Sequence, residues 1–171
     1  MEIKETNLIN VFLFVSLLLL VGCYPNIEET FPDVEASFKQ KTMSDRQDIN
    51  NDFGDISLYI PTNYEVVKEQ TFNYVFLDQH EDLVILFYIP KEDEPRLLEQ
   101  EAMAESLLFL TEEQGEEHFF LSVKSDDKLR EIELTVGSGH VKLTKLTNYD
   151  KIVDDTVVLM EILHSYRWND K

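Results

Sequence analysis

The chain has 171 residues, of which 34 are acidic and 15 basic, and its formal net charge is −19. This charge argues against a nucleic-acid binder, which needs Lys and Arg gathered on one surface, and against a domain that lies flat on anionic lipid. The hydrophobic fraction of 43% and the aromatic fraction of 11% are too high for a disordered tail, so we expect a folded domain.

The N-terminus contains a short apolar segment that runs from Val11 to Val21 and is interrupted only by Ser16. A membrane-spanning helix needs about 20 apolar residues, whereas the core of a signal peptide needs about 7–15. Lys4 supplies a weak positive charge before the segment. The pattern therefore predicts a signal peptide over residues 1–22.

The apolar segment ends in the four residues Leu20-Val21-Gly22-Cys23, and Cys23 is the only cysteine of the chain. This sequence resembles the lipobox of bacterial lipoproteins. The resemblance implies that the thiol of Cys23 is diacylated and that the chain is cut just before it. The protein is then expected on the extracytoplasmic face of the cell membrane, held by fatty acyl chains such as palmitate. The alternatives are a secretory signal with an incidental cysteine and a short uncleaved anchor.

Residues 23–52 are expected to be the lipidated N-terminus and a flexible tether, because they are polar and lack a sustained apolar period. A coil of this length has a root-mean-square span of about 30 Å. Phe31, Val34 and Phe38 offer the alternative that part of the segment docks on the domain. The domain itself is expected over residues 53–171.

The sequence predicts strands followed by a helix in the first half of the domain. Strands are predicted over residues 55–60, 65–67, 72–77 and 83–89, and the last is a continuous apolar run that favours a strand covered on both faces. A helix is predicted over 94–113, with Pro95 in its first turn and Gly115 after its end.

The sequence predicts three strands and a final helix in the second half of the domain. Residues 118–124 form the first strand, and the alternating segments 131–136 and 141–147 form a hairpin about Gly137-Ser138-Gly139. A helix over 151–166 presents an apolar stripe inward. The stripe consists of Ile152, Thr156, Leu159, Leu163 and Tyr166. The fold class is therefore α+β, an antiparallel sheet of about six strands with two packed helices.

A weaker resemblance lies in two segments of the domain, Ile56-Ser-Leu-Tyr-Ile-Pro61 and Ile162-Leu-His-Ser-Tyr166. They are similar to the opening and closing segments of PsbP-like domains, although Thr62-Asn63 stands where those domains have Gly-Trp. The resemblance implies an accessory or binding module.

The acidic segment 91–117 is the strongest candidate for a contact surface. On a continuous helix, Glu94, Glu101, Glu105 and Glu112 fall in one stripe, and Leu98 and Phe109 lie beside it. This face is expected either to be solvated, to dock a basic envelope protein, or to bind Ca²⁺ weakly in its loops, although no EF-hand spacing is present.

No set of residues in the sequence predicts catalysis, a cofactor or a metal site. His80, His118, His140 and His164 are scattered, and Ser138 lies in a hairpin turn rather than in a nucleophile elbow. Trp168 is expected to pack on the sheet edge, with a ligand platform as the alternative. We therefore expect an anchored binding or accessory domain rather than an enzyme, with a small-ligand or cation sensor as the alternative.

Overall fold

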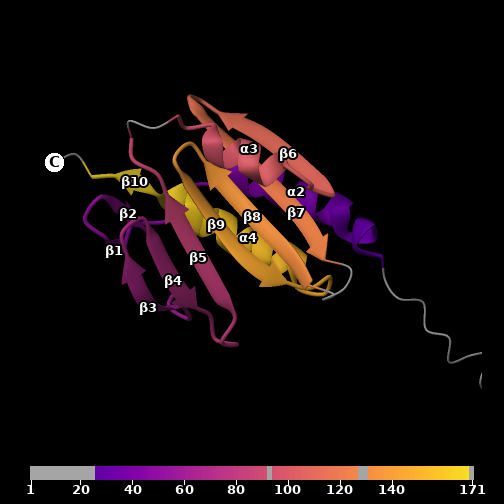
Figure 1. The fold of residues 1–171 in the computed structure, drawn as a ribbon, viewed down its shortest axis with the longest axis horizontal. Coiled ribbons are helices and arrows are strands. Elements are labelled where there is room, and N and C mark those ends of the chain that lie inside the picture. Colours follow the sequence, from indigo (N-terminus) through magenta and orange to yellow (C-terminus); the bar gives the residue numbers. More distant parts are fainter. Residues whose placement is uncertain (1–25, 92–93, 127–130, 170–171) are drawn as a thin grey trace, which may run out of the picture.

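The computed structural model describes residues 26–91, 94–126 and 131–169. The signal peptide and the lipobox predicted from the sequence lie outside these residues. The described chain is α+β, which confirms the predicted class, with an antiparallel sheet as its centre and helices packed on it (Figure 1).

The main sheet has seven strands in the order β3-β4-β5-β9-β8-β7-β6, and every neighbouring pair is antiparallel. Its strands, in chain order, are β3 (Glu65–Gln70), β4 (Asn73–Leu77), β5 (Leu83–Tyr88), β6 (Leu108–Gln114), β7 (Glu117–Asp126), β8 (Glu131–Ser138) and β9 (Val141–Thr147). A smaller sheet at one end of the molecule consists of β1 (Asn51–Asp52), β2 (Ile56–Leu58) and β10 (Arg167–Trp168). The predicted hairpin about Gly137–Gly139 is present as β8 and β9.

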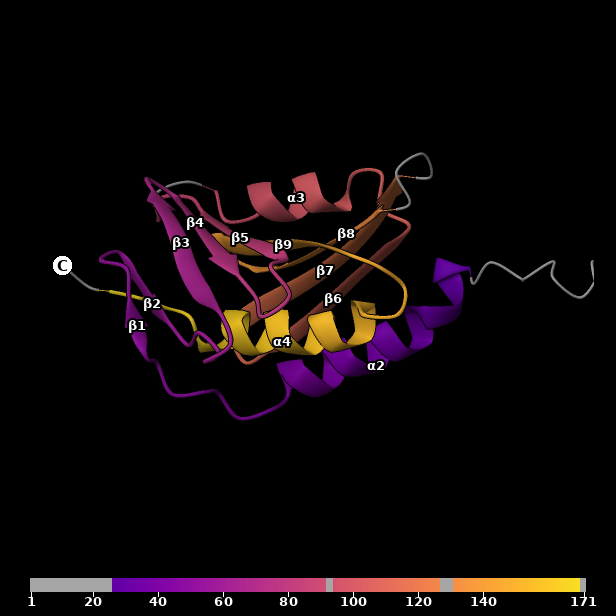
Figure 2. The same ribbon diagram turned by 90° about the horizontal axis from the view of Figure 1, so that it is seen from below.

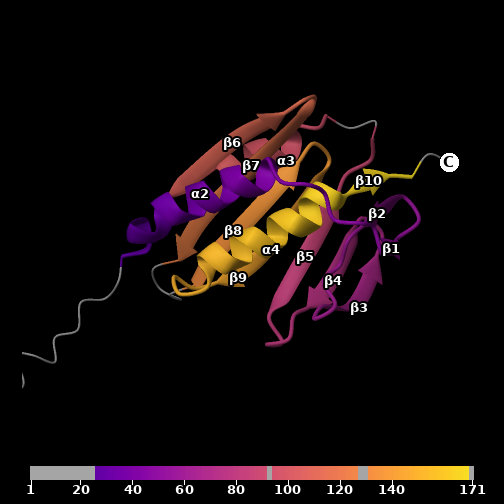
Figure 3. The ribbon, with the colours of Figure 1, turned by 180° about the vertical axis from the view of Figure 1, so that it is seen from behind.

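Helices cover the two faces of the main sheet unequally. The long helices α2 (Phe31–Thr42) and α4 (Ile152–Ser165) lie side by side on one face, and the short helix α3 (Leu97–Met103) lies on the other (Figures 2 and 3). The core lies between the sheet and the α2–α4 layer, where Leu159, Leu163 and Ile152 of α4 are buried. The apolar stripe predicted for the last helix is therefore the core face of α4, except that Tyr166 follows the helix and is only partly buried.

The prediction of a flexible tether over residues 23–52 is wrong for most of the segment. The 3₁₀ helix η1 (Ile27–Thr30) and α2 follow one another, and α2 packs along α4. Val34 and Phe38 are fully buried in the main core, and Lys41 Nζ lies 2.5 Å from Glu161 Oε1 of α4. Phe31, Val34 and Phe38 share one face of α2. Packing of this face against the core holds the helix on the domain, although the rest of the segment is polar.

The helix predicted over 94–113 is much shorter in the structure. It ends at Met103, because Ala104 is extended and Glu105 has a φ of +61°, which an α-helix cannot contain. Residues 108–114 instead form β6, which pairs along its whole length with β7. Gly115, with a φ of +66°, makes the turn between β6 and β7 rather than a helix end. An apolar run of this length fits a strand as well as a helix, and pairing with β7 decides between them.

The strand predicted to be covered on both faces, β5, is covered on one. Val84, Leu86 and Tyr88 are buried, whereas Leu83 and Ile85 are 52% and 43% exposed. The short α3 contacts β7 and β8 and does not reach this part of the outer face. The continuous apolar run is therefore not evidence of burial on both faces, because Leu83 and Ile85 are exposed to solvent.

The two segments that carry the PsbP-like resemblance lie next to each other in the fold. The backbone N–H of Tyr59 donates a hydrogen bond of 2.8 Å to Ser165 Oγ at the end of α4. β10 then continues along β2, with Trp168 opposite Ile56. Trp168 packs edge-on against Tyr88 at a centroid distance of 6.0 Å, so the predicted packing of this indole against the sheet is confirmed.

Candidate functional site

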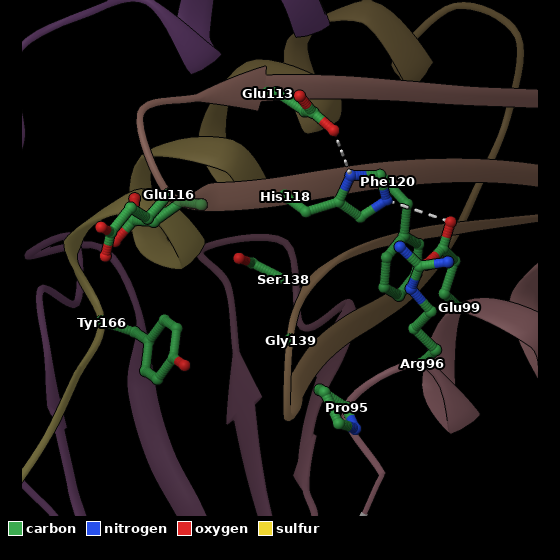
Figure 4. A pocket seen from close by; sticks show the side chains of 11 residues that line it. Pro95, Arg96, Glu99, Glu113, Glu116, His118, Phe120, Ser138, Gly139 and Tyr166 are labelled. Carbon is green, nitrogen blue, oxygen red and sulfur yellow. Dashed lines mark hydrogen bonds and ion pairs between the residues drawn. The ribbon is translucent and has the colours of Figure 1, made fainter.

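A recess of about 440 Å³ opens at the end of the main sheet where the β6–β7 and β8–β9 turns meet the start of α3 (Figure 4). We call it the His118 recess. Its walls come from four separate stretches of the chain, which the antiparallel order of β9, β8, β7 and β6 brings to one edge. The lining residues are Pro95, Arg96, Glu99, Glu113, Glu116, Glu117, His118, Phe120, Ser138, Gly139 and Tyr166.

His118 is held between two carboxylates on one wall of this recess. Its Nε2 lies 3.0 Å from Glu99 Oε1 of α3, and its Nδ1 lies 3.9 Å from Glu113 Oε1. Glu113 and His118 are opposite each other in the β6–β7 pair, which fixes their spacing. Figure 4 shows the imidazole between the two carboxylates, with Tyr166 across the recess from Arg96 and Glu99. An imidazole in this setting can bind a ligand by hydrogen bonds.

The base of the recess depends on the close contact of Phe120 with Gly137. A Cβ at Gly137 would lie 2.1 Å from Phe120 Cζ, so only glycine lets the ring lie flat on β8 at this point. Phe109 stacks on the same ring at a centroid distance of 6.4 Å. Ser138, which is 5% exposed, is the last residue of β8, and Gly139 follows it in the β8–β9 turn.

A second recess of about 550 Å³ lies on the other side of the β6–β7 turn. We call it the His164 recess. It shares Glu116 and Glu117 with the first, and Arg46 forms an ion pair with Glu117 at its rim. Its lining residues are Ser44, Asp45, Arg46, Gln114, Glu116, Glu117 and His164.

His164 is the buried polar group of this second recess. It is 4% exposed, its Nε2 lies 2.8 Å from Gln114 Oε1, and its Nδ1 has no hydrogen-bond partner among the described residues. Burial lowers the pKa of His164, and the positive charge of Arg46 lowers it further. The ring is therefore neutral at pH 7, with its proton on Nε2 donating to Gln114.

This neutral histidine should make the stability of the fold depend on pH. Because the folded state disfavours the protonated ring, the unfolded chain takes up the proton first as the pH falls. The contribution of His164 is complete above its ordinary pKa of 6.5 and declines as the pH drops below that value. Urea unfolding of the wild-type chain and of His164→Gln between pH 7.5 and 5 measures it. We expect the wild type to lose more stability than the variant over this interval, and equal losses would contradict the assignment.

The acidic face predicted from the sequence does not exist as one surface, because the helix that would carry it ends at Met103. Glu101 pairs with Lys142 at 2.8 Å, and Glu112 lies on β6, 3.7 Å from Lys39 of α2. Glu94 and Glu105 are exposed in loops on either side of α3. Leu98 is 3% exposed and Phe109 is partly buried, so neither side chain adds an exposed apolar contact to the predicted face.

The other sequence candidates are also dispersed. Ser138 lines the His118 recess, whereas His140 packs edge-on against Trp168 at 6.0 Å and is not part of the lining. Within residues 26–91, 94–126 and 131–169, no group of three His, Cys, Asp or Glu side chains is arranged to hold a metal ion. The sequence does not predict the pairing of His118 with Glu99 and Glu113, because this pairing depends on the β6–β7 hairpin, part of which the apolar pattern assigns to a helix.

A buried ionic cluster on the core side of the sheet was also missed. Lys145 of β9 is 2% exposed, and its Nζ lies 2.8 Å from Asp78 Oδ2 and 2.7 Å from Asp155 Oδ1 of α4. Burial opposes the charge of Lys145, but its hydrogen bonds to Asp155 and Asp78 outweigh burial and raise its pKa. The sequence does contain an indication of this cluster. Lys145 lies on the same strand face as the apolar residues Val141 and Leu143, so its side chain points toward the core. The cluster joins the loop after β4 to the first turn of α4.

None of the models of known protein families matches this chain, and no curated protein matches its sequence significantly. Among the described helices, none is both long and apolar enough to cross a membrane.

Proposed function

We propose that the chain is a lipoprotein on the extracytoplasmic face of the cell membrane, anchored through Cys23, whose domain binds a small ligand in the His118 recess. The observation that carries the proposal is this polar recess, which gathers side chains from four stretches of the chain at one end of the fold. The competing function, docking of a basic envelope protein on an acidic helix face, loses its support because that face is not formed.

The anchor and the fold are close together in the chain. Only two residues separate Cys23 from Asn26, the first residue that the structure describes, and the three backbone steps from Cys23 to Asn26 can span at most about 10 Å. A lipid on Cys23 would therefore hold the domain next to the membrane, rather than at the distance of about 30 Å that a long tether would give.

The recess lies at the end of the domain away from this attachment point. α2 begins near the anchor and has 12 residues, which corresponds to a length of about 18 Å. Ser44, Asp45 and Arg46 follow the end of α2 and line the second recess. The geometry thus favours a ligand site that faces away from the membrane and is open to the surrounding solution.

The anchor is tested by Cys23→Ser. Two acyl chains hold a protein on a membrane stably, at about 0.8 kcal/mol for each buried methylene, so their loss should release the chain. We expect the wild type to enter the detergent phase, with acyl mass on its N-terminal peptide, and the variant to remain in the aqueous phase without that mass. Met43→Ala, at an exposed position of the domain, should partition like the wild type. A Cys23→Ser protein that stays in the detergent phase would refute the anchor.

A further inference from the structure

The buried cluster of Lys145, Asp78 and Asp155 holds one ammonium group between two carboxylates. Nζ of Lys145 lies 2.8 Å from Asp78 Oδ2 and 2.7 Å from Asp155 Oδ1, and no side chain of the three is more than 11% exposed. Removing charges from water is costly even when they are paired. An amine and a carboxyl group in contact can remove both of their charges by forming an amide, and this cluster places them so.

The carboxyl group of Asp78 is arranged to accept an attack by the amine. Its Oδ2 faces Nζ, whereas its Oδ1 accepts hydrogen bonds from the backbone N–H groups of His80 and Asp82 at 2.7 and 3.0 Å. When an amine adds to the carboxyl carbon, negative charge develops on one of the two oxygens. Backbone N–H groups fixed in position stabilise such a charge, as in an oxyanion hole. One oxygen of Asp78 is therefore stabilised while the other faces the amine.

The carboxyl group of Asp155 is placed to carry protons between the two reacting groups. Its Oδ1 accepts a hydrogen bond from Nζ, and its Oδ2 accepts one from the hydroxyl of Thr147. Asp155 lies in the first turn of α4, where the helix dipole favours a negative charge. It can therefore take up a proton from Lys145, pass it on and become a carboxylate again.

The amine of Lys145 reacts only while Asp155 has taken up one of its protons. Although burial opposes the charge, the hydrogen bonds to Asp155 and Asp78 raise the pKa of Lys145, so the ammonium form predominates. Groups held in contact by a fold react as if present at about 10⁵–10⁸ M. Because the bond has to form only once in the life of each chain, a rare neutral amine is sufficient.

We propose that the chain forms an internal amide bond between Nζ of Lys145 and Cγ of Asp78, with Asp155 as the proton carrier. The new N–C bond replaces the bond between Cγ and Oδ2. Two of the three ammonium protons leave with Oδ2 as one water molecule, and the third stays on the amide nitrogen. The reaction consumes no other reactant. The bond joins β9 to the loop after β4 across 67 positions of the chain.

An internal amide bond suits the location proposed for this domain. Cys23 is the only cysteine of the chain, so the chain has no second cysteine with which to form an internal disulfide. An amide between two side chains provides a covalent link that does not depend on the redox state of the compartment. This inference goes beyond ligand binding in the His118 recess and does not depend on it.

Trypsin digestion of the denatured full chain, followed by mass spectrometry, tests the bond. Trypsin does not cleave after an acylated lysine. The wild type should therefore yield residues 69–91 joined to residues 143–151, with the summed mass of the two peptides less one water. Cleavage after Lys145 in most of the chains, with residues 69–91 recovered as a separate peptide, would overturn the proposal.

A second lysine provides the control within the same molecule. Nζ of Lys151 lies 3.1 Å from Asp82 Oδ2, but the two side chains are 44% and 39% exposed and their charges are solvated. We expect cleavage after Lys151 to be complete. A bond between Lys151 and Asp82 as well would show that contact alone is sufficient and would overturn the role of the buried arrangement.

Two variants of the cluster separate the bond from the ion pairs. Lys145→Arg keeps a positive charge between the carboxylates, but a guanidinium group is always protonated and is no nucleophile, so residues 69–91 should be recovered free. Asp155→Asn keeps the amine and Asp78 but removes the proton carrier, so most of the chains should remain unbonded. Circular dichroism checks that both variants are folded. Lys145→Met would remove the bond and the ion pairs together and cannot separate them.

The peptide map also tests the part given to each carboxyl group. A bonded Asp155→Asn chain would overturn the role of Asp155 as the proton carrier. A link between residues 143–151 and residues 152–167 would overturn the choice of Asp78, because it would place the bond on Asp155. A joined peptide in Lys145→Arg would show that the link does not involve the amine of Lys145 and would overturn the proposal.

Discussion

Replacing Lys145 by methionine should lower the free energy of unfolding by about 3–5 kcal/mol at pH 7. Methionine has nearly the length of lysine but no charge, so the substitution leaves Asp78 and Asp155 facing each other without their shared cation. Asp155 keeps its hydrogen bond from Thr147, and Asp78 keeps those from the backbone N–H groups of His80 and Asp82. These hydrogen bonds stabilise the two buried carboxylates less than the positive charge of Lys145 does. Urea unfolding followed by circular dichroism measures the change.

A second ion pair provides the control for this substitution. Lys151 lies 3.1 Å from Asp82 and is 44% exposed, so solvent screens its charge. Lys151→Met should therefore change the stability by less than about 1 kcal/mol. A similar effect of the two variants would show that the Lys145 cluster is not the buried cross-link that its geometry indicates.

The pH dependence of the Lys145→Met effect provides a further check. In the wild type, burial raises the pKa of Asp78, but the bond from Lys145 and those from the backbone outweigh burial and lower it. The wild type thus loses stability as the pH falls toward the pKa of an ordinary aspartate. In the variant the two carboxylates lack their cation, so protonation relieves them. The difference between the two proteins should be smaller at pH 4.5 than at pH 7, and a constant difference would point to packing instead.

Phe38→Ala should lower the free energy of unfolding by about 3–5 kcal/mol, which is the usual effect of removing a fully buried aromatic side chain. Phe38 is 0% exposed and belongs to the main core together with Val34 and Leu159. The variant leaves a cavity in the main core under α2, a helix that other contacts with α4 keep in place. Chemical denaturation of the full chain measures the loss. A flexible tether, by contrast, would contribute nothing to the stability of the domain.

Met43→Ala is the matched control for this second substitution. Met43 follows α2 directly and is 69% exposed, so its truncation should change the stability by less than about 0.5 kcal/mol. If Phe38→Ala were as mild as Met43→Ala, residues 26–43 would be a tether, and the short distance proposed between a lipid on Cys23 and the domain would have to be revised. The result therefore tests the proposed position of the domain as well as its fold.

The parts of the fold that the sequence predicts correctly are those in which local pattern and tertiary packing agree. The hairpin of β8 and β9 alternates cleanly, and Gly139 with its φ of +55° supplies the turn. The final helix has one apolar face, and that face is buried. In both cases the period of the side chains and their burial report the same structure.

The prediction fails where an apolar run fits two structures equally well. Residues 107–110 are apolar in succession, so they satisfy a helical face or a strand, and only the availability of β7 as a partner makes them a strand. The acidic stripe was a consequence of the helical reading and disappears with it. β5 is the opposite case, in which a continuous apolar run has one buried and one partly exposed face because α3 is too short to cover it.

The sequence by itself determines the class of the fold and the acidity of the chain, because these depend on composition and on short local patterns, and a lipid on Cys23 is a proposal that rests on one such pattern. Only the tertiary structure decides that α2 belongs to the domain, that Lys145 links Asp78 to Asp155, and that His118 and His164 stand on either side of one acidic turn. Each of these depends on contacts between residues far apart in the chain. Such contacts are fixed by strand pairing and helix packing, which no single segment of the sequence contains.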